Sequence, residues 1–164
     1  MLCDIAENIP DRSDAAIQDY LVRILNREVG DRSGKIFGLG HAVYTISDPR
    51  TVIIKRYARK MADARGFAAD FELIEAVERL GIPLVMERIG RDIPMCANVD
   101  LYSGLIYHML GIPDELFTPL FAIARIAGWC AHRLEEVATG GKIIRPAYRS
   151  SMQYSHYVPL EERG

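Results

Sequence analysis

Hydrophobic residues recur at intervals of three and four along most of the chain, the spacing of one face of an α-helix. The first such stretch covers residues 13–30. Ser13 or Asp14 can cap its start, and Gly30 can end it. The pattern predicts an amphipathic helix whose inward residues are Ile17, Tyr20, Leu21, Ile24 and Leu25.

The second helical stretch begins at the Asp-Pro corner near residue 48. Asp48 is suited to the cap position, and Pro49 stands at the first helical position, where its missing N–H costs nothing. Gly66 is expected to end this helix. Its predicted buried face consists of Ile54, Tyr57, Ala58, Met61 and Ala62.

A third, shorter stretch covers residues 70–81, with Leu73, Ile74, Val77 and Leu80 inward. Between residues 82 and 97 the helical spacing fails. Pro83, Gly90 and Pro94 interrupt this segment, so we expect a loop or a short hairpin there.

Two further helices are predicted in the C-terminal half. The first opens at Asn98 or Asp100 and closes at Gly111. The second and longest starts with Thr118 as its cap and stops at the glycine pair 140–141. The tail from residue 142 is expected to be extended and polar. Because no segment has the alternation of a sheet-forming strand, the predicted fold class is all-α.

Composition narrows the class of protein. The 164 residues suffice for one hydrophobic core, and 49% apolar with 26% charged residues is an ordinary globular balance. A net charge of −2 provides no general attraction for nucleic acid or for an anionic membrane. No apolar run approaches the roughly 20 residues of a membrane span.

Three cysteines, Cys3, Cys96 and Cys130, are odd in number, far apart and without metal-ligand spacing. They indicate a reducing compartment, and each is interpreted as a small core residue. The histidines His108, His132 and His156 have no metal-site spacing either, and we place them on helix surfaces or in the tail. We therefore expect a cytoplasmic protein without a metal site.

The segment Gly38-Leu39-Gly40-His41 is not explained by local structure. It looks like a dinucleotide loop, but the third glycine is replaced by Val43 and no strand precedes it. Glycines before a histidine can let the backbone approach a ligand closely. The alternative is that His41 is a hydrogen-bonded core residue.

Other charged residues also allow both a structural and a functional interpretation. Asp100 in the first turn of a helix is either a capping carboxylate or a general base. Arg125 projects from the most apolar helix and needs an anion, which is either a protein carboxylate or a ligand. Arg145 precedes a proline in the tail, where a surface arginine is the usual case.

Taken in order, these motifs resemble one family. Gly-x-Gly-His, Asp-Pro-Arg, Asn-Val-Asp-x-x-Ser-Gly, an apolar helix with an arginine, and Arg-Pro together resemble the C-terminal part of citrate synthases, including 2-methylcitrate synthases. The resemblance covers nearly the whole chain. It implies that residues 1–112 form the small, closing domain, and that residues 113–164 contribute a long helix and a tail to the large domain.

The resemblance also implies roles for individual residues. His41 would polarise the carbonyl of oxaloacetate, and Asp100 would remove a proton from the acyl methyl group of acetyl-CoA. Arg50, Arg125 and Arg145 would hold the two carboxylates, with Arg145 reaching into the site of a partner subunit. The contact region for coenzyme A would consist of Ile36, Phe37, Gly38, Leu39, Gly40 and Asn98.

The implied reaction joins acetyl-CoA, oxaloacetate and water to give citrate and CoA, with acetyl-CoA a substrate and no cofactor required. The full-length protein would be a homodimer. Thr45 and Ala97 depart from the family, which often has a basic residue and a proline at these places. Two active-site histidines of the family lie upstream of Met1, so we expect the isolated chain to be inactive.

Two alternatives remain at this stage. The acyl donor could be propionyl-CoA, since one methylene changes binding by only about 1–3 kcal/mol. The chain could also be a non-catalytic helical module that associates with a partner, in which Asp100 and Arg125 are structural.

Overall fold

The computed structural model describes residues 1–90, 94–140 and 156–163. The chain forms two compact units, Met1–Phe121 and Ala122–Gly164. The regular secondary structure of the described residues is helical, with no strand among them, and their one isolated β-bridge joins Leu39 to Ala97. The predicted all-α class is confirmed. The assignment of residues 1–112 and 113–164 to a small and a large domain stays a prediction.

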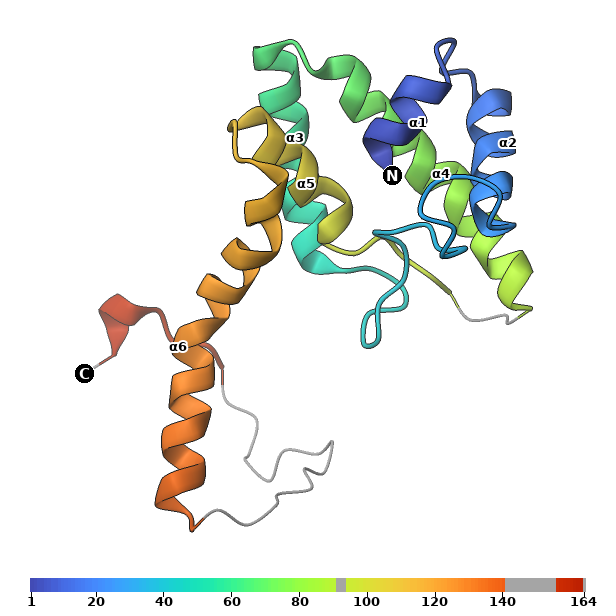
Figure 1. Ribbon diagram of the computed structural model, residues 1–164. Helices are drawn as coiled ribbons and strands as arrows, with labels where there is room; N and C mark the ends of the chain where they lie inside the picture. The colour runs from blue at the N-terminus through green and yellow to red at the C-terminus, as the bar shows by residue number, and fades with distance from the viewer. Residues whose placement is uncertain (91–93, 141–155, 164) are drawn as a thin grey trace. The chain divides into compact units, whose positions relative to one another are not determined.

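Eight helical elements follow one another along the described chain (Figure 1). They are α1 (Leu2–Asn8), α2 (Asp14–Leu25), α3 (Pro49–Arg65), α4 (Ala68–Ile89), α5 (Asp100–Met109), the 3₁₀-helix η1 (Asp114–Leu116), α6 (Phe117–Ala138) and the 3₁₀-helix η2 (Leu160–Glu162).

Helix α4 is the central element of the first unit and contributes to both hydrophobic clusters of its core. One cluster joins α4 to α1, α2 and the buried side chain of Ile36. The other joins α4 to α3 and α5, with Phe71 and Tyr102 as its largest buried residues. Figure 1 shows the long α4 (light green) with α1 and α2 beside it and α3 leading into its start.

The starts of α2 and α3 agree with the prediction. The Ser13 hydroxyl accepts a hydrogen bond from the Ala16 N–H, and the Asp48 carboxylate accepts one from the Arg50 N–H. Gly66 ends α3 in the left-handed conformation. The predicted stop at Gly30 is wrong, because α2 already ends at Leu25.

The predicted buried face of α3 is partly wrong. Ala58 and Ala62 are buried, together with Thr51, but Tyr57 is exposed. The inner face of α3 consists of Ala58 and Ala62 in the second cluster, with the partly buried Ile54 and Met61 packed against it.

The loop predicted for residues 82–97 is wrong for its first half, because α4 continues through Pro83 to Ile89. A proline inside a helix removes one backbone hydrogen bond and costs about 3 kcal/mol. The continuation is offset by burial, since Leu84 and Val85 pack against the first cluster. Gly90 then ends the helix in the left-handed conformation.

Three smaller features also differ from the prediction. Helix α1 was not predicted, because it is short and has no capping side chain. Helix α6 begins at Phe117, directly after η1, so Thr118 is not its cap. Cys3 and Cys130 are exposed, and only Cys96 is the buried residue that we expected of all three cysteines.

Among the described residues, no helix combines the length and apolar character needed to cross a membrane. The same residues contain no group of three or more histidine, cysteine or acidic side chains that could hold a metal ion.

Candidate functional site

The glycine-containing loop before His41 is clamped to the segment that leads into α5. The Gly40 N–H donates to the Cys96 carbonyl at 2.8 Å, and the Asn98 N–H donates to the Gly38 carbonyl at 2.9 Å. The Asn98 side chain also donates to the Gly40 carbonyl at 2.8 Å. These bonds hold His41 close to the start of α5.

Gly38 is required here by the packing of the chain itself. Its φ of 90° is in the left-handed region, and a Cβ at this position would lie 2.8 Å from the Cβ of Leu101 and 2.9 Å from its Cα. The sequence suggested glycines for close approach to a ligand. At Gly38 the close neighbour is α5.

His41 has a defined tautomer. Its Nδ1 accepts hydrogen bonds from the Val43 N–H at 3.0 Å and from the Tyr44 N–H at 3.1 Å. Since Nδ1 is an acceptor, the proton of the neutral imidazole is on Nε2. This Nε2 lies 3.1 Å from Nη2 of Arg50, which is also a donor. Two N–H donors therefore converge at one place.

Asp48 orients Arg50. Its carboxylate is buried and accepts bonds from the Arg50 N–H and Nε at 3.0 Å each, and from Nη2 at 2.8 Å. The hydrogen bond from the Arg50 side chain lowers the pKa of Asp48, and the same bond raises the pKa of Arg50. The sequence identified Asp48 only as a cap. Its second role, the orientation of Arg50, could have been inferred from the sequence, because the two oppositely charged residues are only two positions apart.

Asp100 occupies the first turn of α5, where the helix dipole favours its negative charge. The Asn98 side-chain oxygen accepts the Asp100 N–H at 3.0 Å. The carboxylate is exposed, and its charge contributes to the raised pKa of Arg50. The first unit thus brings three of the predicted residues, His41, Arg50 and Asp100, into one region.

Arg125 lies on α6 in the second unit, and Arg145 lies outside the described residues. Their roles stay predictions.

A groove of about 600 Å³ runs along the loop before His41. Five of the six residues predicted to contact coenzyme A line it, and they share it with Asp100: Ile36, Phe37, Gly38, Leu39 and Asn98. The sixth, Gly40, lines the neighbouring hollow. The groove also contains two basic residues that sequence reasoning missed, Lys35 and Arg88. Arg88 was missed because its segment was predicted to be a loop.

The neighbouring hollow, of about 150 Å³, lies beside His41. Its walls include Tyr44, Met86 and Pro94, and it shares Ile89 and Met95 with the groove. The hollow is therefore largely apolar and adjoins both the imidazole and the groove.

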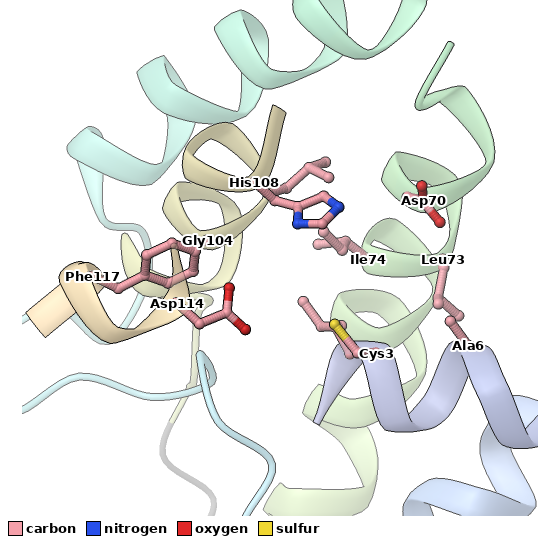
Figure 2. A pocket seen from close by; sticks show the side chains of 11 residues that line it. Cys3, Ala6, Asp70, Leu73, Ile74, Gly104, His108, Asp114 and Phe117 are labelled. Carbon is pink, nitrogen blue, oxygen red and sulfur yellow. The ribbon is translucent and has the colours of Figure 1, made fainter. Parts of the chain in front are cut away.

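A separate cavity of about 230 Å³ lies between α1, α4 and α5 (Figure 2). Leu73, Ile74 and Leu105 make its walls largely apolar, and Cys3 and His108 also line it. None of the residues predicted for the site lies in this cavity. It is distinct from the groove around His41 and Asp100.

Comparison with known proteins identifies the family. The sequence pattern of a protein family described as "Citrate synthase, C-terminal domain" matches residues 1–147. The chain belongs to the citrate synthase family. It is 38% identical over 134 residues to the citrate synthase of Deinococcus radiodurans, covering 81% of this chain and 34% of that protein.

Two further members of the citrate synthase family are informative. The 2-methylcitrate synthase of Shewanella oneidensis is 34% identical over 144 residues, covering 88% of this chain and 34% of its own length. The citrate synthase of Thermoplasma acidophilum, solved with carboxymethyl coenzyme A and oxaloacetate, superposes with a TM-score of 0.65 at 29% identity. That match covers 99% of this chain and 41% of the solved one. The chain thus spans about a third of the length of its curated relatives.

Proposed function

We propose that the chain forms part of a citrate synthase, an acyltransferase that condenses acetyl-CoA with oxaloacetate and water to citrate and CoA. Acetyl-CoA is a substrate, and the reaction needs no cofactor. In its complete form the enzyme is a cytoplasmic homodimer. Membership of the family supports this proposal, and so does the arrangement of hydrogen-bond donors around His41.

The convergence of His41 and Arg50 carries the proposal. Two N–H donors 3.1 Å apart cannot hydrogen-bond each other, so an acceptor that lies within reach of both nitrogens can take a hydrogen bond from each. The carbonyl and carboxylate oxygens of oxaloacetate are such acceptors. A proton-bearing Nε2 directed at the carbonyl oxygen withdraws electrons from the carbonyl carbon and stabilises the alkoxide that forms on it.

Arg50 is well suited to a carboxylate. Its guanidinium is fixed by Asp48 and is partly exposed, with 42% of the side-chain surface accessible. A planar arginine can donate two parallel hydrogen bonds to one carboxylate, which lysine cannot do. In the proposed enzyme Arg125 and Arg145 complete the hold on the two carboxylates, Arg145 from the partner subunit.

Asp100 is the proposed base. It removes a proton from the methyl carbon of the acetyl thioester, and the electrons of the broken C–H bond form the enolate. The enolate carbon then bonds to the carbonyl carbon of oxaloacetate, whose oxygen receives the displaced electron pair beside His41. Water finally cleaves the thioester to release CoA. The shared groove of Asp100 and the loop 36–39 supports this order of groups.

Oxaloacetate binding tests the proposal. Oxaloacetate should raise the melting temperature of the wild-type chain, and His41→Ala should reduce this gain because one donor to the ligand is lost. His132→Ala is the matched control, since this exposed histidine lies on α6 and not in the site. Equal gains in the wild type and His41→Ala, or no gain in either, would contradict the proposal.

Arg125→Leu examines the arginine of the second unit in the same assay. Loss of the oxaloacetate-dependent gain would support its role as a carboxylate ligand. An unchanged gain would instead indicate that Arg125 is structural.

We also propose that the isolated chain turns over little or no substrate, because it spans only about a third of the length of its curated relatives. Mixing it with acetyl-CoA and oxaloacetate should release almost no free CoA thiol. Rapid release would disprove this point while leaving the assignment of His41 and Asp100 intact.

A propionyl-CoA-dependent 2-methylcitrate synthase is the second candidate, and the apolar hollow beside His41 favours it. The flexible side chains of Met86 and Met95 can make room for one additional methyl group. Competitive binding of acetyl-CoA and propionyl-CoA distinguishes the two activities. Tighter binding of propionyl-CoA, weakened by Met95→Phe, would support the second candidate.

A further inference from the structure

The cavity between α1, α4 and α5 has an apolar interior and a polar entrance. Its interior is formed by three buried side chains, Leu73, Ile74 and Leu105. His108 and Asp114 also line the cavity, but both are exposed and therefore lie where it opens to solvent. All of these residues belong to the unit Met1–Phe121. Such a lining suits a ligand with an apolar body and one polar end.

The cavity is large enough for a small organic molecule. Its volume is about 230 Å³, and an apolar cavity of about 150 Å³ already suffices to bind benzene. Gly104 of α5 contributes to this space. Apart from its chain neighbours and its own helix backbone, a Cβ added to Gly104 would meet only the Phe117 ring, at 3.9 Å. An aromatic ring with a short side chain is therefore of suitable size.

The charge around the cavity is negative. Asp70 and Asp114 line it, and among the described residues no lysine or arginine does. Arg12 partly neutralises Asp70, since Nη1 and Oδ1 of the pair are 3.3 Å apart. In the portions of the chain that the structure describes, Asp114 forms no ion pair. Its charge is available to a cationic ligand.

His108 supplies a second hydrogen-bonding group. Figure 2 shows its imidazole, on α5, and the Asp114 carboxylate, on η1, both directed into the cavity. A carboxylate accepts hydrogen bonds, and a neutral imidazole has one acceptor nitrogen. A group with several N–H donors and a positive charge therefore matches this entrance.

We propose that this cavity binds a small apolar amine, whose hydrocarbon part lies among the buried leucine and isoleucine side chains and whose ammonium group lies at Asp114 and His108. An ammonium group has three N–H donors, and its hydrogen bond to a carboxylate is charge-assisted. The cavity is separate from the proposed condensation reaction, because no residue lines both it and the groove or the hollow near His41.

Titration of the wild-type chain with 2-phenylethylamine, followed by ¹H–¹⁵N NMR, tests the proposal. A ligand of this size should bind with a Kd on the order of 1 mM. Asp114→Asn should weaken binding about fivefold, the effect of losing one exposed ion pair. Glu115→Gln is the matched control, because this exposed neighbour carries the same charge outside the cavity lining and should leave the affinity unchanged.

Two further comparisons separate charge from shape. 2-Phenylethanol has nearly the same shape as the amine but no charge, so it should bind the wild type more weakly and should bind Asp114→Asn about as well as the wild type. Gly104→Leu should abolish binding of both molecules, because the added side chain enters the cavity from an unstrained helical position. Circular dichroism confirms that each variant is folded.

Cysteine alkylation tests the location of the ligand. Cys3 is exposed and lines the cavity, whereas Cys130 is exposed on α6. Saturating 2-phenylethylamine should slow the reaction of Cys3 with N-ethylmaleimide and leave the reaction of Cys130 unchanged. Mass spectrometry of the two peptides measures both rates in one sample.

Several results would overturn the inference. No binding at millimolar concentration, retained binding in Gly104→Leu, or an unchanged alkylation rate of Cys3 would show that the amine does not occupy the cavity. Equal affinities of the wild type and Asp114→Asn, or of the amine and the alcohol, would show that the ligand class is wrong. None of these results bears on oxaloacetate binding at His41, so the proposed function would stand.

Discussion

At the scale of single residues, Asp48 performs two tasks with one carboxylate. It caps α3 and it fixes the guanidinium of Arg50, which in turn lies beside His41. The cap could be predicted, since Asp before Pro is a common helix start. The contact with His41 could not, because it depends on how the loop between His41 and Asp48 folds back.

Replacing Asp48 should separate these two tasks. Asn is as good a cap as Asp but carries no charge, so Asp48→Asn should lose only the ion pair with Arg50. Asp48→Ala should lose the cap as well, at a further cost of about 1 kcal/mol. Chemical denaturation at neutral pH measures both changes. Equal stabilities of the two variants would show that the cap contributes nothing.

Because the pKa of Asp48 is lowered in the folded protein, the stability of the fold should depend on pH. Because the folded-state pKa lies below the ordinary 3.8, the stabilisation is complete above pH 3.8 and is lost as the pH falls through the lower folded value. The stability difference between the wild type and Asp48→Asn should stay constant from about pH 7 to 5 and shrink in more acidic solution. Thermal melts across this pH range measure the difference in stability. A difference that grows in acid would contradict the lowered pKa of Asp48 in the folded state.

At the scale of elements, the sequence predicts helices well where caps and periodicity agree. For α3 they do: Asp48 begins the helix and Gly66 ends it. In α4, Pro83 was interpreted as an interruption, but burial of the residues after it keeps the helix intact. A prediction from local sequence cannot include that burial, because the burial depends on α1 and α2, which are separate in the sequence and pack against α4.

The contact between the loop and α5 also leads to a prediction. Gly38→Ala should lower the free energy of unfolding by about 3 kcal/mol, since it adds a clash with Leu101 to the cost of a left-handed backbone. Gly66→Ala is the control: its φ of 82° is similar, and apart from the residue itself and its two chain neighbours no described atom lies within 4 Å of the added Cβ. It should cost about 1 kcal/mol.

Both glycine variants can be compared by urea denaturation. Equal losses would mean that the backbone conformation alone requires Gly38. If the loop positions the groove as proposed, Gly38→Ala should also weaken binding of coenzyme A, whereas Gly66→Ala should leave it unchanged.

At the scale of the whole molecule, the order of the motifs along the chain predicted the family, which no single motif could do. His41, Arg50 and Asp100 each have an ordinary structural explanation, and their sequence separation gives no distance between them. The clamp formed by Gly40, Cys96 and Asn98 joins them, and it was not visible in the sequence, because a pairing between segments so far apart leaves no periodic pattern. The role of Arg125 depends in addition on the second unit.

The second unit carries an apolar stripe that leads to the last prediction. Ile123, Ile126, Leu134 and Val137 follow helical spacing on α6 and are exposed by 66%, 53%, 72% and 60%. A contiguous apolar surface on a helix favours association with another apolar surface. We therefore expect the isolated chain to self-associate as its concentration rises, by pairing of these stripes.

A charge on the stripe should prevent this association. Ile126→Lys would place an unpaired ammonium in the apolar contact, which is costly to desolvate. Ala124→Lys introduces the same charge on a different face of α6 and should leave self-association intact. Sedimentation velocity over a range of concentrations distinguishes them. A wild-type chain that stays monomeric throughout, or equal dissociation of both variants, would show that the stripe is not the contact surface.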